Sequence, residues 1–239
     1  MSTQEEKVQY LNCEHKIVYI LLMTAAGMMG AYTFNLRGGV FCNAQTANFV
    51  MMSIAFGKKQ LSEGFYYLIP ISAYFLGTFI SEVLPSPVKR FKFLRWDTYL
   101  VAFEAITLFG IGFIPLSVPD HVVQVIINFI ASMQYNTFRQ AEGVPMATTF
   151  CTNHLRQMGI AGARILRKKD FGALSRMFLH GAMIACFFLG GFILTLACGP
   201  LREKAIWLAL LPVLAVLCKL VHGDLTVEHQ LLGRVPSGH

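Results

Sequence analysis

Uncharged hydrogen-bonding side chains gather in two segments of an otherwise apolar sequence. The first segment holds Asn43, Gln45, Thr46 and Asn48. The second holds Thr148, Thr149, Thr152, Asn153 and His154. Each cluster follows a Gly or Pro break and continues into a partly apolar stretch that could be helical. Amide and hydroxyl groups of this kind bind small solutes, but they also cap helices and bond helices to one another, at about 0.6 to 2 kcal/mol per bond in a membrane. We therefore predict a substrate-binding site in these segments and keep helix capping as its alternative.

Three further polar features belong to the candidate chemistry. Gln134 and Asn136 precede the second segment and extend the predicted substrate-binding set. Arg37 and Arg139 follow comparable apolar runs, where an arginine either extends to the membrane interface or binds an anionic group. His154, next to a basic stretch, is expected to be solvated or to cap a helix, with a proton relay as the alternative.

Glu104 is the most unusual ionisable residue, because it lies well inside the apolar run from Tyr99 to Val118. A charged group at the centre of a bilayer costs at least about 2.5 kcal/mol. One interpretation is a protonated glutamic acid that hydrogen-bonds to Asn128 or Gln134. The other is a proton or cation coupling site, whose affinity for protons is raised by burial.

No constellation typical of an enzyme is present. Cys13, Cys42, Cys151, Cys186, Cys198 and Cys218 show no C-x-x-C spacing, and the histidines show no metal-ligand spacing. The sequence also lacks the phosphate-binding motif of a self-contained ATP-driven pump. We expect no catalytic residue, no metal and no cofactor.

Composition decides the class of protein that must position these residues. The chain has 239 residues, of which 55% are hydrophobic and only 14% charged, and its mean hydropathy is +0.54. These values indicate an integral membrane protein. The net charge of +7 comes from clusters between apolar runs, which indicates membrane topology and no nucleic-acid partner.

Six apolar runs are long enough to cross a bilayer as helices. They extend over residues 17–34, 65–84, 99–118, 122–138, 177–197 and 205–221. Strands of a membrane barrel would be shorter and would alternate in polarity, so the predicted fold is all-α, a polytopic helical bundle of six transmembrane helices.

The distribution of Lys and Arg predicts the orientation of this bundle. With both termini inside, fifteen of these residues fall in cytoplasmic segments and five in outer ones. Residues 1–16 and 223–239 are then cytoplasmic tails. The basic cluster of Arg164, Arg167, Lys168 and Lys169 is expected to contact anionic lipid headgroups on that side.

An internal repeat is the second architectural prediction. Residues 74–80 and 187–193 are identical at five of seven positions, and the order of helix end, Gly-Val pair, polar segment and Phe-Leu-Gly helix recurs along the chain. Three spans per copy force the second copy to enter the membrane in the opposite sense. We thus predict inverted three-helix repeats, residues 17–118 and 119–222, with interrupted or re-entrant motif segments. The glycines of the Phe-Leu-Gly motifs are expected to permit close helix packing.

The same motifs resemble a known family. Gly-Gly-Val-Phe at residues 38–41, Thr-x-Asn at 46–48, and Val-Pro-x-Ala-Thr-Thr at 144–149 are similar to those of the YoaK family, bacterial six-span proteins of unknown function. The resemblance covers about residues 17–221 and implies a multi-pass protein of the bacterial inner membrane. The sequence departs from the family pattern where Ala47 and Asn153 stand after the motif threonines in place of glycine.

Together these features favour secondary transport of a small polar solute, with proton coupling through Glu104. A channel would explain the polar clusters but not a lone buried carboxyl group. A non-transporting scaffold or sensor stays open as well, and so does assembly into a homo-oligomer.

Overall fold

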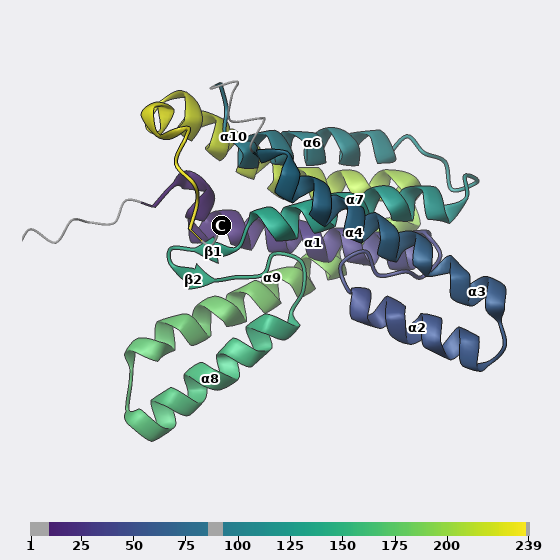
Figure 1. The fold of residues 1–239 in the computed structure, drawn as a ribbon, viewed down its shortest axis with the longest axis horizontal. Helices are drawn as coiled ribbons and strands as arrows, with labels where there is room; N and C mark the ends of the chain where they lie inside the picture. The colour runs from purple at the N-terminus through teal and green to yellow at the C-terminus, as the bar shows by residue number, and fades with distance from the viewer. Residues whose placement is uncertain (1–9, 86–92, 238–239) are drawn as a thin grey trace, which may run out of the picture.

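The structure is a computed structural model that describes residues 10–85 and 93–237. It is built almost entirely of helices, arranged around one core with two arms that extend toward opposite ends of the long axis (Figure 1). Of the basic residues used for the orientation, Lys7, Lys89, Arg90 and Lys92 lie outside the described residues.

In the first half of the chain, the described residues form a short 3-10 helix and five α-helices, each coinciding with or flanking an apolar run. They are η1 (Asn12–Glu14), α1 (Lys16–Leu36), α2 (Gln45–Gly57), α3 (Leu61–Tyr66), α4 (Leu68–Val83) and α6 (Trp96–Ile111). Helix α1 ends where Gly38 and Gly39 adopt positive φ angles of 74° and 70°, a conformation that costs glycine little. The polar residues that follow this break lead directly into α2.

The second half contains longer helices and a pair of short strands. It comprises α7 (Asp120–Thr137), strands β1 (Gln140–Ala141) and β2 (Val144–Pro145), α8 (Thr152–Lys168), α9 (Gly172–Leu201), η3 (Arg202–Ala209), α10 (Leu210–Leu225) and η4 (His229–Leu231). The stretches that follow both polar segments are helical, as their composition suggested.

The mostly helical structure agrees with the all-α prediction, and the one strand pair among the described residues is the small antiparallel hairpin of β1 and β2. Gln140 pairs with Pro145 and Ala141 with Val144. The two turn residues, Glu142 and Gly143, have φ angles of 47° and 77°, and positive φ at both positions fits a two-residue hairpin turn. The hairpin turns the chain back from the end of α7 toward the middle of the molecule (Figure 1).

Close helix packing occurs at two glycines, as predicted. Helix α1 packs along α9, and α4 packs along α7. A side chain at Gly190 would meet the Thr24 carbonyl of α1, and one at Gly77 would meet the Phe129 carbonyl of α7. Glycine at these points lets the two backbones of each pair approach.

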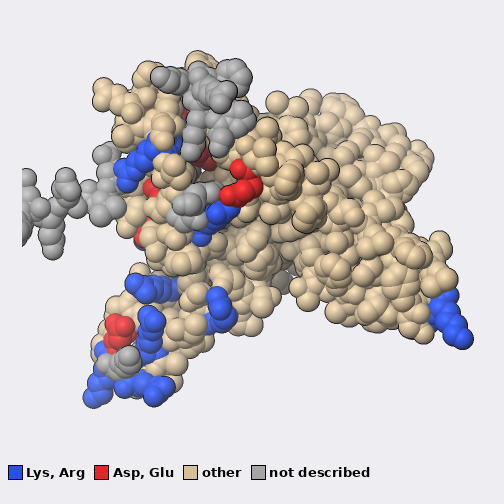
Figure 2. All heavy atoms as spheres, viewed as in Figure 1, with Lys and Arg blue, Asp and Glu red and all other residues tan. Residues whose placement is uncertain are grey.

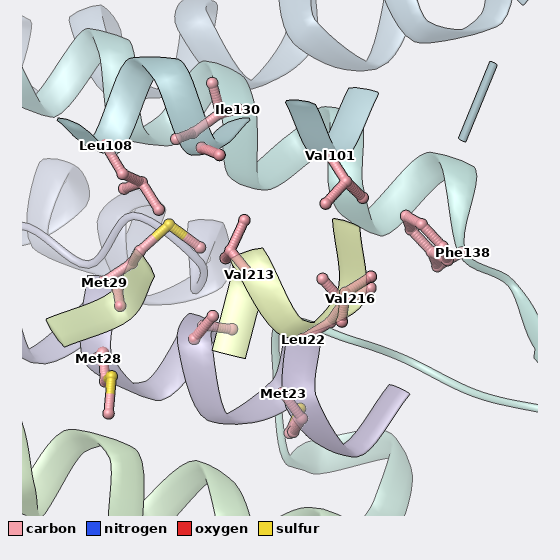
Figure 3. Close-up of a cluster of buried hydrophobic side chains, with 14 of the residues drawn as sticks. Leu22, Met23, Met28, Met29, Val101, Leu108, Ile130, Phe138, Val213 and Val216 are labelled. Carbon is pink, nitrogen blue, oxygen red and sulfur yellow. The ribbon is translucent and has the colours of Figure 1, made fainter. Parts of the chain in front are cut away.

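The hydrophobic core lies where α1, α6, α7 and α10 meet. Figure 3 shows Leu22 and Met29 of α1 among Leu108 of α6, Ile130 of α7 and Val213 of α10, and all five are buried. Away from this core, large apolar side chains are exposed on several helices. Examples are Phe75, Phe79, Ile106, Phe178, Phe188 and Leu196. Broad apolar exposure of this kind is typical of a lipid-facing surface.

Three helical stretches among the described residues are long and apolar enough to cross a membrane. They are Lys16–Leu36, Leu61–Val83 and Gly172–Leu225. On the face seen in Figure 2, most charged atoms lie in the left part of the view, including the α8–α9 arm, a smaller basic group lies at the tip of the α2–α3 arm, and most of the surface between them is uncharged. Apolar middles and charged ends support a membrane protein.

Candidate functional site

The two polar segments meet at one cavity. Phe41 and Asn43, just before α2, and Cys151, just before α8, line a cavity of about 590 Å³ together with one face of α1 and one face of α9. In Figure 1 the N-terminal ends of α2 and α8 approach each other from opposite arms at this position. Phe34, Phe188 and Phe192 of its wall are half-exposed or more, so the space is an open groove between α1 and α9; we call it the central cavity.

Apolar side chains form most of the wall of the central cavity. The residues from α1 are Gly27, Gly30, Ala31, Phe34 and Asn35, and those from α9 are Ile184, Phe187, Phe188, Gly191, Phe192 and Thr195. Asn35 donates to the Thr195 hydroxyl at 3.2 Å, and Asn43 donates to the Ala26 carbonyl at 3.2 Å. A few polar groups in an apolar wall are what a site for a small organic molecule requires.

The first polar segment is held by a chain of hydrogen bonds. Gln45 Nε2 donates to Asn128 Oδ1 of α7 at 2.8 Å. Asn48 Nδ2 donates to Gln45 Oε1 at 3.1 Å and to the Phe41 carbonyl at 2.9 Å. Asn48 is almost completely buried, so these bonds satisfy a side chain that water does not reach.

Helix α7 continues this chain to the end of α1. Gln124 Nε2 donates to the Arg37 carbonyl at 2.6 Å, and Gln124 Oε1 accepts from the Tyr66 hydroxyl at 2.9 Å. Arg37 itself is fully buried and donates to the carbonyls of Ile114 at 2.6 Å and Pro115 at 3.1 Å. The prediction that Arg37 extends to the interface is wrong, because its guanidinium group satisfies backbone carbonyls after α6.

The second polar segment leaves hydrogen-bonding groups without partners. Gln134 Nε2 donates to the Thr148 carbonyl at 3.3 Å, while Gln134 Oε1 and the hydroxyls of Thr148 and Thr149 have no hydrogen-bond partner although all three residues are buried. The Tyr74 hydroxyl lies near the Thr149 hydroxyl, as a neighbour that could become its hydrogen-bond partner after a small movement. A buried polar group without a partner costs about 1 to 3 kcal/mol, so these atoms are candidates for binding a solute or water.

The remaining predicted residues divide between two places. Thr46 and Thr152 lie in the first turns of α2 and α8 and are exposed. Asn153 accepts from Arg156 at 3.0 Å. Asn136 donates to Ser81 and to Glu82, each at 2.9 Å. Asn136 and Asn153 line a second cavity of about 340 Å³ with Arg139, so the structure brings these two together away from Asn43.

Glu104 is fully buried on α6, and neither carboxyl oxygen has a hydrogen-bond partner. The suggested bonds to Asn128 and Gln134 do not occur, since Asn128 bonds to Gln45 and Gln134 bonds to Thr148. Glu104 is not among the residues that line the central cavity. An unpaired carboxylate is costly to bury, which favours the neutral acid here.

His154 differs from its prediction, because it is buried and bound to a second histidine. Its Nδ1 lies 2.9 Å from Nδ1 of His180, and its Nε2 lies 2.8 Å from the Ala147 carbonyl oxygen. Burial lowers the pKa of His154, partly offset by the bond to Ala147. The structure thus excludes a solvated His154.

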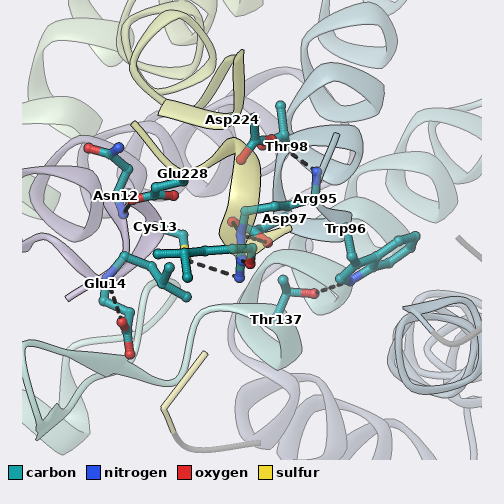
Figure 4. Close-up of polar contacts among 12 residues, drawn as sticks. Asn12, Cys13, Glu14, Arg95, Trp96, Asp97, Thr98, Thr137, Asp224 and Glu228 are labelled. Carbon is teal, nitrogen blue, oxygen red and sulfur yellow. Dashed lines mark hydrogen bonds and ion pairs between the residues drawn. The ribbon is translucent and has the colours of Figure 1, made fainter. Parts of the chain in front are cut away.

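A charged cluster at the end that carries both termini was missed by the sequence analysis. Figure 4 shows Arg95 and Asp97 at the start of α6 beside Asp224 and Glu228 near the end of the chain. The Arg95 amide donates to Asp224 at 2.9 Å, and the Asn12 amide donates to Glu228 at 2.5 Å. Burial raises the pKa of Glu228. The one available signal was acidic residues within basic flanking segments.

No group of three or more metal-ligating side chains occurs among the described residues. The titratable elements of these sites are the histidine pair, the carboxyl groups near Arg95 and the lone carboxyl group of Glu104.

Comparisons with known proteins agree with the membrane architecture. A family model described as DUF1275, protein of unknown function, matches residues 18–218. The UPF0700 transmembrane protein YoaK of Bacillus subtilis (strain 168) is 21% identical over 202 residues, which cover 82% of this chain and 90% of that protein. No solved structure matches. The chain is a transmembrane protein that belongs to the DUF1275 family.

Proposed function

We propose that this protein is a secondary transporter that carries a small solute across the bacterial inner membrane and binds it in the central cavity. The solute has a polar group and an apolar portion. The polar group meets the N-terminal ends of α2 and α8, and the apolar portion contacts the α1 and α9 side chains. One observation carries the proposal: Asn43 of the first polar segment and Cys151, which lies within the second, come from different halves of the chain and line the same cavity, whereas the other residues of the two predicted sets lie outside its wall.

The packing of the helices supports an inverted repeat of six spans. When α1, α2, α4 and α6 are exchanged for α7, α8, α9 and α10, most of the observed neighbours are exchanged too, except that α8 packs extensively along α9 whereas α2 barely contacts α4. Helix α1 packs on α9 as α7 packs on α4, and α6 packs on α10. The glycine contacts follow the same exchange, with Gly190 against α1 and Gly77 against α7. Inverted repeats of this kind bind substrates between their halves and expose the site alternately to each side.

Two interrupted segments provide the polar part of the site. Helices α2 and α8 both begin beside the cavity, and a helix N-terminus presents unpaired amide groups and a partial positive charge. Thr46 and Thr152 are exposed in these first turns and are available to a solute. Backbone of this kind is tolerated at membrane depth where it faces protein or a water-filled cavity.

Glu104 serves as the proton-coupling residue in this proposal. Its buried carboxyl group has no protein partner, so a change of access during the transport cycle alters the free energy of its charged form. We place both termini and residues 139–176, which include α8, on the cytoplasmic side, where the basic residues of α8 contact anionic lipid headgroups. No catalytic reaction is required of any residue.

The test begins with a screen of small carboxylates, amines and neutral amphiphiles for compounds that raise the unfolding temperature of the purified protein. Compounds that bind are then added to proteoliposomes on a solid-supported membrane, and transport currents are recorded. The variant Ala31→Phe fills the central cavity and should abolish binding and current. The control Ala163→Phe, at an exposed position of α8, should retain both.

Glu104→Gln separates coupling from binding. This variant should bind the same compound but lose the dependence of the current on a pH gradient. Transport with the native gradient response would refute the coupling role, and native transport by Ala31→Phe would refute the central cavity as the site.

A further inference from the structure

A second polar cavity lies on the α8–α9 arm, outside the central cavity. It occupies about 240 Å³ between the tip of the β1–β2 hairpin and the facing sides of α8 and α9. Its walls are formed by Gly143, Val144, Pro145, Gln157, Ile160, Ala161, Arg164, Ala173, Arg176 and His180. We call it the arm pocket. Since liquid water occupies about 30 Å³ per molecule, a phosphate-sized group fits with a few waters.

Every ionisable side chain that lines the arm pocket, among the described residues, is basic: Arg164, Arg176 and His180. Glu142 is adjacent in sequence to Gly143 of the pocket wall, but its carboxylate forms an ion pair with Lys16 at 2.5 Å and does not line the pocket. Gln157 adds an amide, and the Tyr10 hydroxyl lies beside Gly143 at the hairpin tip. Arginine pairs in such a setting are suited to bidentate hydrogen bonds with oxyanions.

The histidine pair determines which nitrogen His180 offers to a ligand. Because a carbonyl only accepts, His154 Nε2 must carry a proton toward Ala147. The two Nδ1 atoms, 2.9 Å apart, then share a single proton. Nδ1 of His180 is thus occupied by His154, and Nε2 is the nitrogen left for the pocket.

One added proton is compatible with every bond of the pair. If His180 donates through Nδ1, its neutral form has a free lone pair at Nε2, and protonation turns Nε2 into a donor. In the protonated pair either histidine can hold the shared proton between the two Nδ1 atoms, and in both cases Nε2 of His180 carries an N–H group. In either arrangement, the protonated pair presents an N–H group and a positive charge beside Arg176 and Arg164. An anion in the pocket would stabilise this form, and without one the nearby guanidinium groups oppose it.

We propose that the arm pocket binds a phosphate-type oxyanion, with Arg164 and Arg176 as cationic ligands and Nε2 of His180 as a third ligand that acts when the histidine pair is protonated. Two sources share this chemistry, a free anion and a phospholipid headgroup. Helix α8 exposes apolar residues such as Leu155, Ile160 and Leu166 along with its basic residues, as helices at a membrane interface do.

Sulfate is the first probe, because its charge stays constant where a phosphate monoester titrates, at about pH 6. Calorimetric titration of the purified full-length protein in neutral detergent should show binding. Arg164→Gln or Arg176→Gln should weaken it about tenfold, which corresponds to about 1.4 kcal/mol. Arg167→Gln is the matched control, an exposed arginine on the same helix that does not line the pocket. It should change the affinity less than about twofold, since distant exposed charges are screened.

The proton dependence gives an independent readout. Because burial, His154 and Arg176 disfavour the protonated pair in the empty pocket, affinity for sulfate should rise mainly below about pH 6.5, with proton uptake measured in buffers of different ionisation enthalpy. His180→Gln should retain weaker binding and lose the proton uptake. If His180→Gln keeps the native proton uptake, the assigned role of the histidine is wrong.

Lipid nanodiscs distinguish the two sources. If the ligand is a headgroup, phosphatidic acid should bind to the native protein in a neutral lipid background, sulfate should compete, and Arg176→Gln should abolish the binding. If the ligand is a free anion, sulfate should bind with equal affinity with and without phosphatidic acid. The proposal would be overturned if neither sulfate nor phosphatidic acid bound. It would also be overturned if Arg167→Gln lost as much sulfate affinity as Arg164→Gln or Arg176→Gln. None of these measurements depends on transport.

Discussion

Helix α1 lies against α9 with Gly190 at the contact, and α7 lies against α4 with Gly77 at the contact, so the long helices of the two halves pack alike. The polar segments of the same halves differ. In the first, Gln45 is bonded to Asn48 and also to Asn128 of α7. In the second, Thr148 and Thr149 keep buried hydroxyls without partners.

This difference suggests a division of work between the halves. A fully hydrogen-bonded segment is rigid and fixes the position of α2, whereas unsatisfied groups favour rearrangement or a bound solute. We therefore expect the first segment to act as a fixed wall of the central cavity and the second to respond to ligand.

The largest effects should follow substitutions at the glycine contacts, where the halves are alike. Gly77→Leu and Gly190→Leu place side chains against the backbone carbonyls of Phe129 and Thr24, so each should reduce the free energy of unfolding by more than about 3 kcal/mol. Unfolding in mixed micelles measures the loss. Gly199→Leu is the control, because nothing lies near that position. If only one of the two substitutions caused a large loss of unfolding free energy, the two helix pairs would not pack alike.

The hydrogen bonds of α7 that continue the chain from the first polar segment should be the next most sensitive place. Gln124→Leu removes the bonds to Tyr66 and to the Arg37 carbonyl and leaves both partners unsatisfied, so a loss of about 2 kcal/mol is expected in the same assay. Gln60→Leu, at an exposed position, should change stability by less than about 0.5 kcal/mol. Equal stability of the two variants would show that the hydrogen-bond chain contributes nothing.

The second polar segment should behave in the opposite way. Thr148→Val and Thr149→Val replace hydroxyls that have no partner, so stability without solute should stay constant or rise by about 1 kcal/mol. Thr33→Val is the contrasting variant, because the Thr33 hydroxyl donates to Met29 and Gly30 carbonyls and its removal should destabilise. A loss in the Thr148 or Thr149 variant equal to that of Thr33→Val would mean that these hydroxyls do have partners.

The smallest effect concerns pH. Burial lowers the pKa of His154 in the folded protein, so the unfolded chain takes up a proton first, near its ordinary value of about 6.5. Stability should be constant above that value and should fall as the pH drops below it. Unfolding in anion-free buffer between about pH 5 and about pH 8 measures this slope. His154→Gln should flatten it, while His229→Gln, at an exposed site, should leave it unchanged.

The helices could be predicted from the sequence because hydrophobic runs and their Gly and Pro breaks are local signals. Each of the six apolar runs overlaps a helix, although the run 99–118 extends past the end of α6 at Ile111 and which runs cross the bilayer stays a prediction. The β1–β2 hairpin could not be predicted in the same way, because it depends on positive φ at Glu142 as well as at Gly143.

Contacts between distant residues were beyond the reach of local patterns. Arg95 and Asp224 are bonded across 129 positions of sequence, and His154 and His180 meet because α8 and α9 fold back on each other. Arg37 was expected at the interface because arginine extends there when it faces lipid, but the loop after α6 offers it two carbonyls. The placement of Asn43 and Cys151 at one cavity follows from the arrangement of the halves.

Access to Cys151 tests the central claim most directly, because Cys151 lines the central cavity and is half-buried. In a Cys186→Ala, Cys218→Ser background, the rate of labelling by an impermeant maleimide is measured in right-side-out and in inside-out vesicles. The account predicts labelling from both sides, with a ratio of rates that shifts when a solute found in the binding screen is added. Labelling from one side only, or a ratio that no bound solute changes, would contradict transport through this cavity.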